Sequence, residues 1–484
     1  MKSKMLSFII SVGVLNLFIS LSVQAFHNDN PDTTDVAIPE MRTYQFHVPV
    51  EYFTLSNGLK VVLSEDHASP TVSVGVYYDI GFRNEPRNMT GFAHLFEHMM
   101  FQGSENLKKM EFLDLVSSNG GVLNGTTRFD FTNYYEVIPS KNLETVLWAE
   151  ADRMNSIVLS ESNIENQKDV VKNEVKVAVQ NAPYGGFPWL DMPQYAFENW
   201  HNSHNFYGDF EDLDAAEEKD FLNFFENYYK PNNAVLVVVG DIDLQKTKGL
   251  VERFFSSISP GNIATKPVTT EPKQLKQKVF TKIDRLASQP AVAFAYQMPK
   301  RNTPEYYAMG LIDQLLMQGD DSQMSRIFVN EHNITGDLKG GINYLLGNMF
   351  NYKEEMLWMG SFIYNADVPQ EKLIKLLDEA IEDYLEREVS KEELALAMTK
   401  IKSSFYDIQE DFHGFGKADL LACFALFDDN PNLINEVISN FEKVTPKVIK
   451  ETARKYLKKD NRTILFISPP LPKQSQINAQ EVKS

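Results

Sequence analysis

A segment in the middle of the chain recurs close to its end, and this repeat limits the folds that the 484 residues can adopt. Residues 228–237 (YYKPNNAVLV) and 456–465 (YLKKDNRTIL) each join the end of a helical pattern to a buried apolar strand. A second pair of apolar strands, residues 71–78 and 291–298, recurs at a similar distance. The two pairs together indicate that one domain fold is present twice.

The repeat agrees with the length of the chain, which is too long for one ordinary domain. Turn and linker residues divide it into parts. The expected parts are a signal peptide (1–25), an N-terminal extension (26–44), a first domain (45–258), a linker with prolines and lysines (259–278), a second domain (279–470) and a polar tail (471–484).

Strand patterns alternate with helical patterns in both halves, and the clearest helical patterns cover residues 143–156, 219–229 and 370–386. The predicted fold class is therefore α+β, with two homologous domains that each contain a mainly antiparallel sheet covered by helices. A hydrophobic content of 43% is enough for two large cores.

The N-terminus has the three parts of a secretory signal. Lys2 and Lys4 precede an apolar run over residues 5–23, and small residues end it at Ala25. The absence of arginine before Arg42 argues against a mitochondrial presequence, which is arginine-rich. We expect cleavage after Ala25 and a location in the periplasm of a Gram-negative bacterium, with an uncleaved inner-membrane anchor as the second interpretation.

Charge and cysteine content narrow the possible partners. The net charge of −19 makes nucleic acid and anionic membrane surfaces poor partners. An acidic cleft that attracts cationic peptides is one functional hypothesis, and solubility is the simpler explanation. The single cysteine, Cys423, cannot form an internal disulfide, and we expect it to be buried in a helix.

The strongest functional signal is the sequence His94-Leu95-Phe96-Glu97-His98. On a helix, residues i and i+4 share one face, so His94 and His98 can bind one metal ion, and Glu97 can accept a proton from water beside it. The order H-x-x-E-H is the inverted form of a zinc metalloprotease motif. The alternative is two unrelated histidines that happen to lie near a glutamate.

A third protein ligand has to come from another segment. Residues 163–181 form a helical pattern that opens with Ser162-x-x-Glu165, a capping-box sequence. Four valines (Val170, Val171, Val175 and Val177) are expected to face a core, which leaves Glu174 as an acid among apolar neighbours. Such a glutamate can be a metal ligand, although most helical glutamates are simply solvated.

The neighbouring sequence resembles the pitrilysin, or insulinase and mitochondrial processing peptidase, family of zinc metallopeptidases. The resemblance rests on residues 81–85 (GFRNE), 90–93 (TGFA) and 99–104 (MMFQGS) around the histidines. In that family the third zinc ligand is a glutamate about 76 residues after the second histidine. Residues 167–174 (QKDVVKNE) match that segment, so the resemblance implies one Zn²⁺ per chain, held by His94, His98 and Glu174. One departure is Gln167, where the family usually has an acid near the metal ligands.

The resemblance also gives a role to residues 120–137, which by themselves predict a glycine turn followed by a strand. In the family this strand borders the cleft, the peptide substrate pairs with it as an added strand, and an asparagine helps to hold it. Asn124 occupies that position. Without the resemblance, an ordinary hairpin with a solvated polar face would be the preferred interpretation.

The expected function is that of a zinc-dependent endopeptidase acting on peptides or unfolded polypeptides, with zinc-bound water activated by Glu97. Family members of this size close two chains into a chamber, and a second half or partner often supplies an arginine and a tyrosine. Residues 325–333 (SRIFVNEHN) keep the start of that pattern, but no convincing pair follows. We therefore expect a second, zinc-free homologous chain as partner, and a homodimer as second choice.

Two other functions remain open at this point. One is a non-catalytic or weakly active assembly subunit of a processing-peptidase-like complex. The other is a zinc hydrolase that does not act on peptides, which would leave the strand around Asn124 and the duplication unexplained. His201 and His204, which lie in an aromatic segment, are expected to be structural.

Overall fold

The computed structural model describes residues 47–344 and 346–470. The expected signal peptide, the N-terminal extension and the polar tail lie outside these ranges. Within them, none of the helices is long and apolar enough to cross a membrane.

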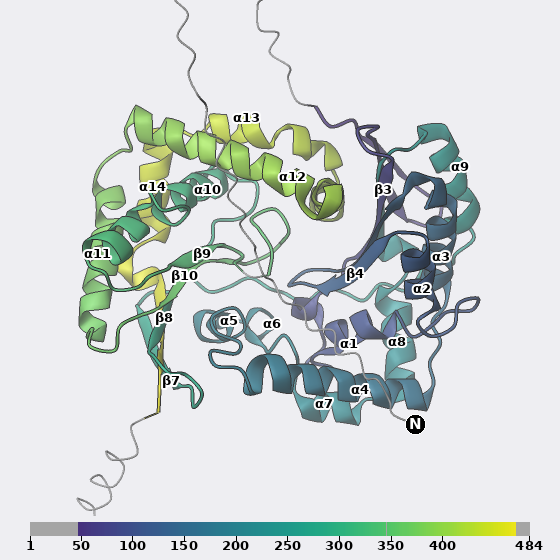
Figure 1. The fold of residues 1–484 in the computed structure, drawn as a ribbon, viewed down its shortest axis with the longest axis horizontal. Helices are drawn as coiled ribbons and strands as arrows, with labels where there is room; N and C mark the ends of the chain where they lie inside the picture. The colour runs from purple at the N-terminus through teal and green to yellow at the C-terminus, as the bar shows by residue number, and fades with distance from the viewer. Residues whose placement is uncertain (1–46, 345, 471–484) are drawn as a thin grey trace, which may run out of the picture. The chain divides into compact units, whose positions relative to one another are not determined.

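The first half of the chain builds a six-stranded sheet in the order β1-β2-β6-β3-β5-β4. Figure 1 shows two of its strands, β3 and β4. Its strands are β1 Glu51–Thr54, β2 Lys60–Glu65, β3 Thr71–Tyr78, β4 Val122–Thr127, β5 Thr132–Pro139 and β6 Ala234–Gly240. Only the β2–β6 pair is parallel, and β4 forms one edge of the sheet.

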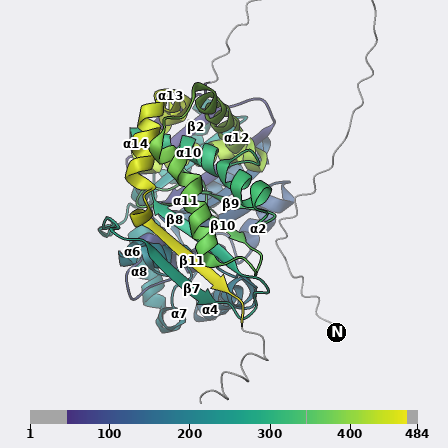
Figure 2. The same ribbon diagram turned by 90° about the vertical axis from the view of Figure 1, so that its left-hand side faces the viewer.

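The second half builds a five-stranded sheet in the order β7-β11-β8-β10-β9, and Figure 2 shows β11 beside β7. Its strands are β7 Lys278–Ile283, β8 Ala291–Gln297, β9 Lys339–Ile342, β10 Leu357–Ile363 and β11 Arg462–Ser468. Again only one pair is parallel, β7 with β11. The connectivity repeats that of β2 to β6, which confirms the duplicated α+β fold with mainly antiparallel sheets.

The predicted helices at 143–156, 219–229 and 370–386 are confirmed with end shifts of one residue at most. The α-helices are α1 Phe92–Met99, α2 Glu111–Ser118, α3 Leu143–Asn155, α4 Glu161–Val175, α5 Asp191–Ala196, α6 Trp200–Ser203, α7 Phe210–Ala215, α8 Glu218–Tyr228, α9 Leu244–Phe255, α10 Pro304–Leu316, α11 Gln370–Glu386, α12 Lys391–Asp428, α13 Val437–Glu442 and α14 Pro446–Tyr456. A π-helical segment, Lys176–Gln180, continues α4.

Both faces of the first sheet are buried. Successive side chains of a strand point to opposite faces, so each strand contributes side chains to two cores. On β3, Val72, Val74 and Val76 join the core shared with α1, α3, α8 and α9. On the other face Tyr77 joins a core formed largely by the second half. The long helix α12 covers this face, so a helix from the second half helps to build the environment of the first sheet.

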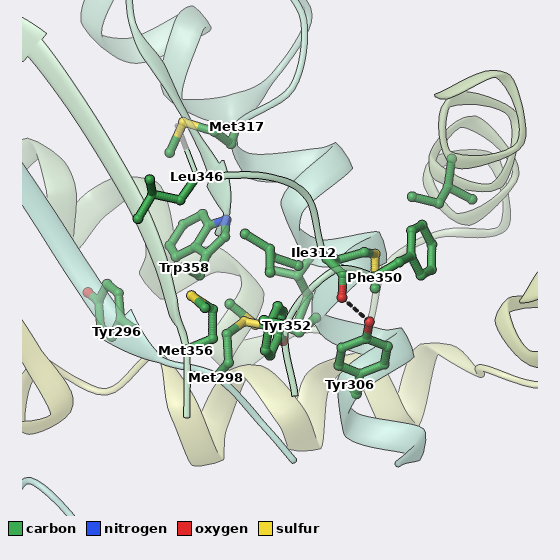
Figure 3. Packing of buried hydrophobic residues seen from close by; sticks show 14 of the residues in the cluster. Tyr296, Met298, Tyr306, Ile312, Met317, Leu346, Phe350, Tyr352, Met356 and Trp358 are labelled. Carbon is green, nitrogen blue, oxygen red and sulfur yellow. Dashed lines mark hydrogen bonds between the residues drawn. The ribbon is translucent and has the colours of Figure 1, made fainter. Parts of the chain in front are cut away.

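The second core is rich in aromatic and methionine side chains, as Figure 3 shows around Trp358, Tyr296 and Tyr306. Cys423 is fully buried on α12, as its sequence context predicts. Buried aromatic rings of this kind each remove a large apolar area from water, so they contribute much of the stability of this half.

Candidate metal centre and active site

Helix α1 carries the two histidines of the H-x-x-E-H motif. It begins after Gly91, whose φ of 80° is in the left-handed region that glycine adopts without strain. His94 and His98 lie one turn apart, and their Nε2 atoms are 3.3 Å from each other. His94 is buried, whereas His98 is partly exposed.

Helix α4 brings Glu174 to the same point. Its Oε1 lies 3.7 Å from His94 Nε2, and its Oε2 lies 3.5 Å from His98 Nε2. The side chain of Glu174 is 37% exposed, so this acid is reached by solvent from one side.

Two details of α4 differ from the sequence analysis. The helix is capped by Ser160, whose hydroxyl accepts the Asn163 N–H, and the predicted cap at Ser162 is wrong. Val171 and Val175 are buried, but Val170 and Val177 are exposed. The apolar stripe is therefore narrower than predicted, because one helix face is enough to bury α4 against its neighbours.

The three side chains fit a small metal ion. Their potential ligand atoms, two imidazole nitrogens and one carboxylate oxygen, all lie within 4.8 Å of one another, and they form the only such group found among the described residues. Tetrahedral zinc with bonds of about 2.0 Å separates neighbouring ligand atoms by about 3.3 Å, which is the spacing of the two histidine nitrogens. The same donor set is common in catalytic zinc sites.

The protonation of these groups also favours a cation between them. Burial, and then the neighbouring His98, lower the pKa of His94 to about 4, so its ring is neutral at pH 7. Burial alone would raise the pKa of Glu174, but its contacts with His98 and His94 outweigh burial and lower it. The neutral His94 ring and the Glu174 carboxylate can therefore donate lone pairs to one metal ion.

Glu97 lies next to this group without belonging to it. Its Oε2 accepts a hydrogen bond of 2.8 Å from the hydroxyl of Thr127 on β4. Burial raises the pKa of Glu97, as expected for a carboxylate that is mostly removed from water. A side chain at position 125 would bring a Cβ within 3.1 Å of Glu97 Cγ, so Gly125 leaves room for the carboxylate.

Strand β4 presents an open edge beside Glu97. Leu123, Gly125 and Thr127 face helix α1, whereas Asn124 points to the other face of the sheet. Asn124 is exposed and lies opposite Tyr135 on β5. Phe415 of α12 stacks on Tyr135 with ring centroids 3.6 Å apart, so the second half reaches the neighbourhood of this edge.

No individual role was predicted from the sequence for several other residues around the site. Glu85 is buried and accepts hydrogen bonds from the N–H groups of Gly91 (2.9 Å) and Ala93 (2.6 Å) at the start of α1. Tyr207 donates a hydrogen bond of 3.2 Å to Glu174 Oε1. Thr127 and Tyr207 are 30 and 33 residues from their partners in sequence, and Glu85 is six and eight residues from the groups it binds, so the folded structure was needed to identify these contacts.

The remaining candidates have other partners. His204 lies 3.3 Å from Glu85 and stacks on Trp200, and His201 contacts the carbonyl of Arg83, so both histidines have structural contacts. Gln167 is buried and bonds to the neighbouring Asn166.

Comparison with known families matches two family models to the chain, and the boundary between the matches lies before β6, the last strand of the first sheet. Residues 60–202 match the model of the insulinase family, also called peptidase family M16. Residues 216–401 match the model described as the inactive domain of peptidase M16. The motif residues from His94 to His98 fall within the first match.

Individual relatives agree with this assignment. The chain is 26% identical over 431 residues to the zinc protease PqqE of Helicobacter pylori, covering 87% of this chain and 93% of that protein. It is 29% identical over 188 residues to the beta subunit of the bovine mitochondrial-processing peptidase, covering 39% and 38%.

Solved structures show the same fold. A protease from Helicobacter pylori superimposes with a TM-score of 0.78 at 25% identity, covering 88% of this chain and all of that one. The periplasmic protease PqqL of Escherichia coli gives a TM-score of 0.71 at 16% identity, covering 89% of this chain and 48% of that one. The two family matches, the full-length relative and the duplicated fold show that this chain belongs to the insulinase family, peptidase family M16.

Proposed function

We propose that this chain is a zinc-dependent endopeptidase that hydrolyses peptides or unfolded polypeptides. The observation that carries the proposal is the meeting of His94, His98 and Glu174 beside Glu97, next to the open edge of β4. The relatives named as zinc proteases support the same chemistry.

The proposed ligands of one Zn²⁺ are His94 Nε2, His98 Nε2 and a carboxylate oxygen of Glu174. When bound, zinc supplies Lewis acidity, which polarises the scissile carbonyl and acidifies water. This role requires three protein ligands and one open position, and the partly exposed sides of His98 and Glu174 leave access to the site.

Glu97 is the proposed general base. Its carboxylate would take a proton from the attacking water and deliver it to the amine of the leaving peptide. The hydrogen bond from Thr127 holds Oε2, so Oε1 is the oxygen available for this transfer. The environment that raises its pKa also makes the carboxylate a stronger base.

The edge of β4 is the proposed substrate platform. An extended peptide that adds there pairs through its main chain, which binds many sequences with little side-chain selection. Asn124, exposed on this edge, is the proposed side-chain contact to the peptide.

A substitution of Glu97 by glutamine tests the mechanism. Glu97→Gln keeps the size of the side chain but removes its basicity, so zinc content and peptide binding should persist while kcat falls at least about 100-fold. Metal analysis and cleavage of a quenched peptide library measure both properties. Turnover comparable with that of the wild type would refute the assignment.

Location and assembly belong to the same proposal. We infer export to the periplasm through residues 1–25, and a zinc-free homologous chain as partner. The beta subunit of the processing peptidase and the periplasmic protease PqqL are relatives whose names point in these directions. Light scattering on the purified chain, alone and after co-expression with a homologue that lacks the motif, tests the partner; full activity as a monomer would rule it out.

A second function follows from a specific similarity. The chain is 30% identical over 208 residues to subunit 1 of the rat cytochrome b-c1 complex, which is named as part of an assembly. A non-catalytic assembly subunit would not need Glu97 beside the three candidate ligands. Zinc binding without cleavage of any library peptide would favour this alternative.

A further inference from the structure

Tyr207 lies outside the proposed ligand set and contacts two of its members. Its hydroxyl donates to Glu174 Oε1 at 3.2 Å, and its ring meets the His94 ring edge to face, with centroids 5.1 Å apart. Tyr207 is only 6% exposed, so little of this side chain is open to solvent.

The backbone of the loop that carries Tyr207 packs closely against the start of α1. A Cβ at Gly91 would lie 2.4 Å from the Tyr207 carbonyl oxygen, and one at Gly208 would lie 2.3 Å from Thr90. Only glycine at both positions allows this backbone contact, and both have positive φ angles.

Hydrogen bonds hold the same loop in place. Asp209 N–H donates to the Thr90 hydroxyl at 2.9 Å, and that hydroxyl donates to Asp212 at 2.6 Å. The Tyr207 N–H donates to the Asn205 side chain at 3.0 Å. The position of the Tyr207 ring is therefore set by the backbone on both sides of it.

The proposed function supplies the context for the next step, because it makes Glu174 a zinc ligand. A carboxylate on a partly exposed helix can rotate, and each orientation that does not point to the histidines weakens metal binding. A buried donor on a fixed loop restricts that rotation. Partners of this kind commonly change metal affinity 10- to 100-fold.

We propose that Tyr207 is a positioning residue that holds the Glu174 carboxylate against the two histidines and thereby sets the zinc affinity of the site. The loop that carries Tyr207 packs against α1, and the Tyr207 hydroxyl bonds to Glu174 on α4, which is the third proposed ligand. The hydroxyl acts through Glu174 and does not touch the substrate.

The test measures zinc affinity, which does not depend on peptidase activity. Tyr207→Phe removes the hydroxyl but keeps the ring, and competition with a chromophoric chelator should show binding 10- to 100-fold weaker than that of the wild type. Tyr195→Phe, a half-buried tyrosine that packs on Phe280 away from the site, is the matched control and should bind zinc like the wild type.

A double-mutant cycle separates positioning from a general loss of structure. In a Glu174→Ala background, the further change Tyr207→Phe should alter zinc affinity less than about twofold, because the acceptor of the hydroxyl is gone. An equal loss in both backgrounds would overturn the proposal, as would wild-type affinity in Tyr207→Phe.

The same measurements distinguish this inference from the proposed function. A wild type that binds one zinc but cleaves nothing would contradict the proposed peptidase, while the affinity loss in Tyr207→Phe would still support the role of Tyr207. A wild type that takes up no zinc would overturn both. Cleavage with unchanged affinity in Tyr207→Phe would leave the peptidase standing and sink the inference alone.

Discussion

Thr127 shows how much of the site depends on single contacts. Its hydroxyl is the donor that holds one oxygen of Glu97, and it comes from the strand proposed to bind the substrate. Because Thr127 is buried, no water can take over this bond without rearrangement. The orientation of the base is thereby coupled to the position of β4.

Replacing Thr127 by valine keeps the shape and removes the hydroxyl. We expect kcat to fall about tenfold or more with zinc content unchanged, because a misplaced base loses rate steeply. Steady-state kinetics and metal analysis measure the two effects. Thr399→Val, whose hydroxyl bonds within α12 in the second half, serves as control and should leave kcat unchanged.

Helix α1 is an element of only eight residues, and its position depends on the groups at its N-terminus. The Glu85 carboxylate accepts two of the N–H groups that have no partner within the helix, and its negative charge favours this end of the helix dipole. Burial raises the pKa of Glu85 although His204 and these donors oppose it.

Glu85→Gln replaces one acceptor oxygen by a donor that would face a backbone N–H. The free energy of unfolding should fall by about 1–3 kcal/mol, and zinc should bind more weakly because α1 loses its anchor. Denaturant unfolding and chelator competition measure these changes. Glu111→Gln at the exposed start of α2 is the control; a loss there as large as in Glu85→Gln would contradict the argument.

Elements were largely predictable from the sequence, and contacts between elements were not. The period of the apolar residues located α3, α8 and α11, and the repeat anticipated the shared connectivity of the two sheets. The start of α4 was misplaced by two residues because Ser160 and Ser162 both satisfy a capping pattern. Which serine caps depends on the direction from which the chain enters the helix.

At the scale of the whole molecule, the two halves share one core. The Tyr77 hydroxyl donates to Asp419 of α12 at 2.7 Å, and Lys417 pairs with Asp66 at 2.6 Å. The part of the chain with the candidate metal site is therefore supported by helix α12 of the second half. Because residues of both halves pack in this core, the halves should unfold together.

Asp313, which is buried in the second half, should make the free energy of unfolding depend on pH. Burial raises its pKa to about 7, although Trp358 donates to it at 2.7 Å. Between the usual value of about 3.9 and 7, the native state holds a proton that the unfolded state has lost, so stability falls as pH rises through this window.

Asp313→Asn lacks this titration. The unfolding free energy of the variant relative to the wild type should rise by about 2 kcal/mol between about pH 5.5 and about pH 8. Urea unfolding at several pH values tests this. Asp337→Asn, at an exposed position, should show no such trend, and a flat difference for Asp313→Asn would show that the carboxyl titrates normally.

The class of fold, its duplication and the position of His94 and His98 on one helix face could be predicted from the sequence alone, because these depend on short periods and on spacing along the chain. The groups that hold Glu97, Glu174 and α1 were identified from the folded structure. Thr127, Tyr207 and Glu85 act through contacts across 30, 33 and 8 residues of sequence, respectively. Such contacts come from the packing of strands, loops and helices against each other, and local patterns carry no record of that packing.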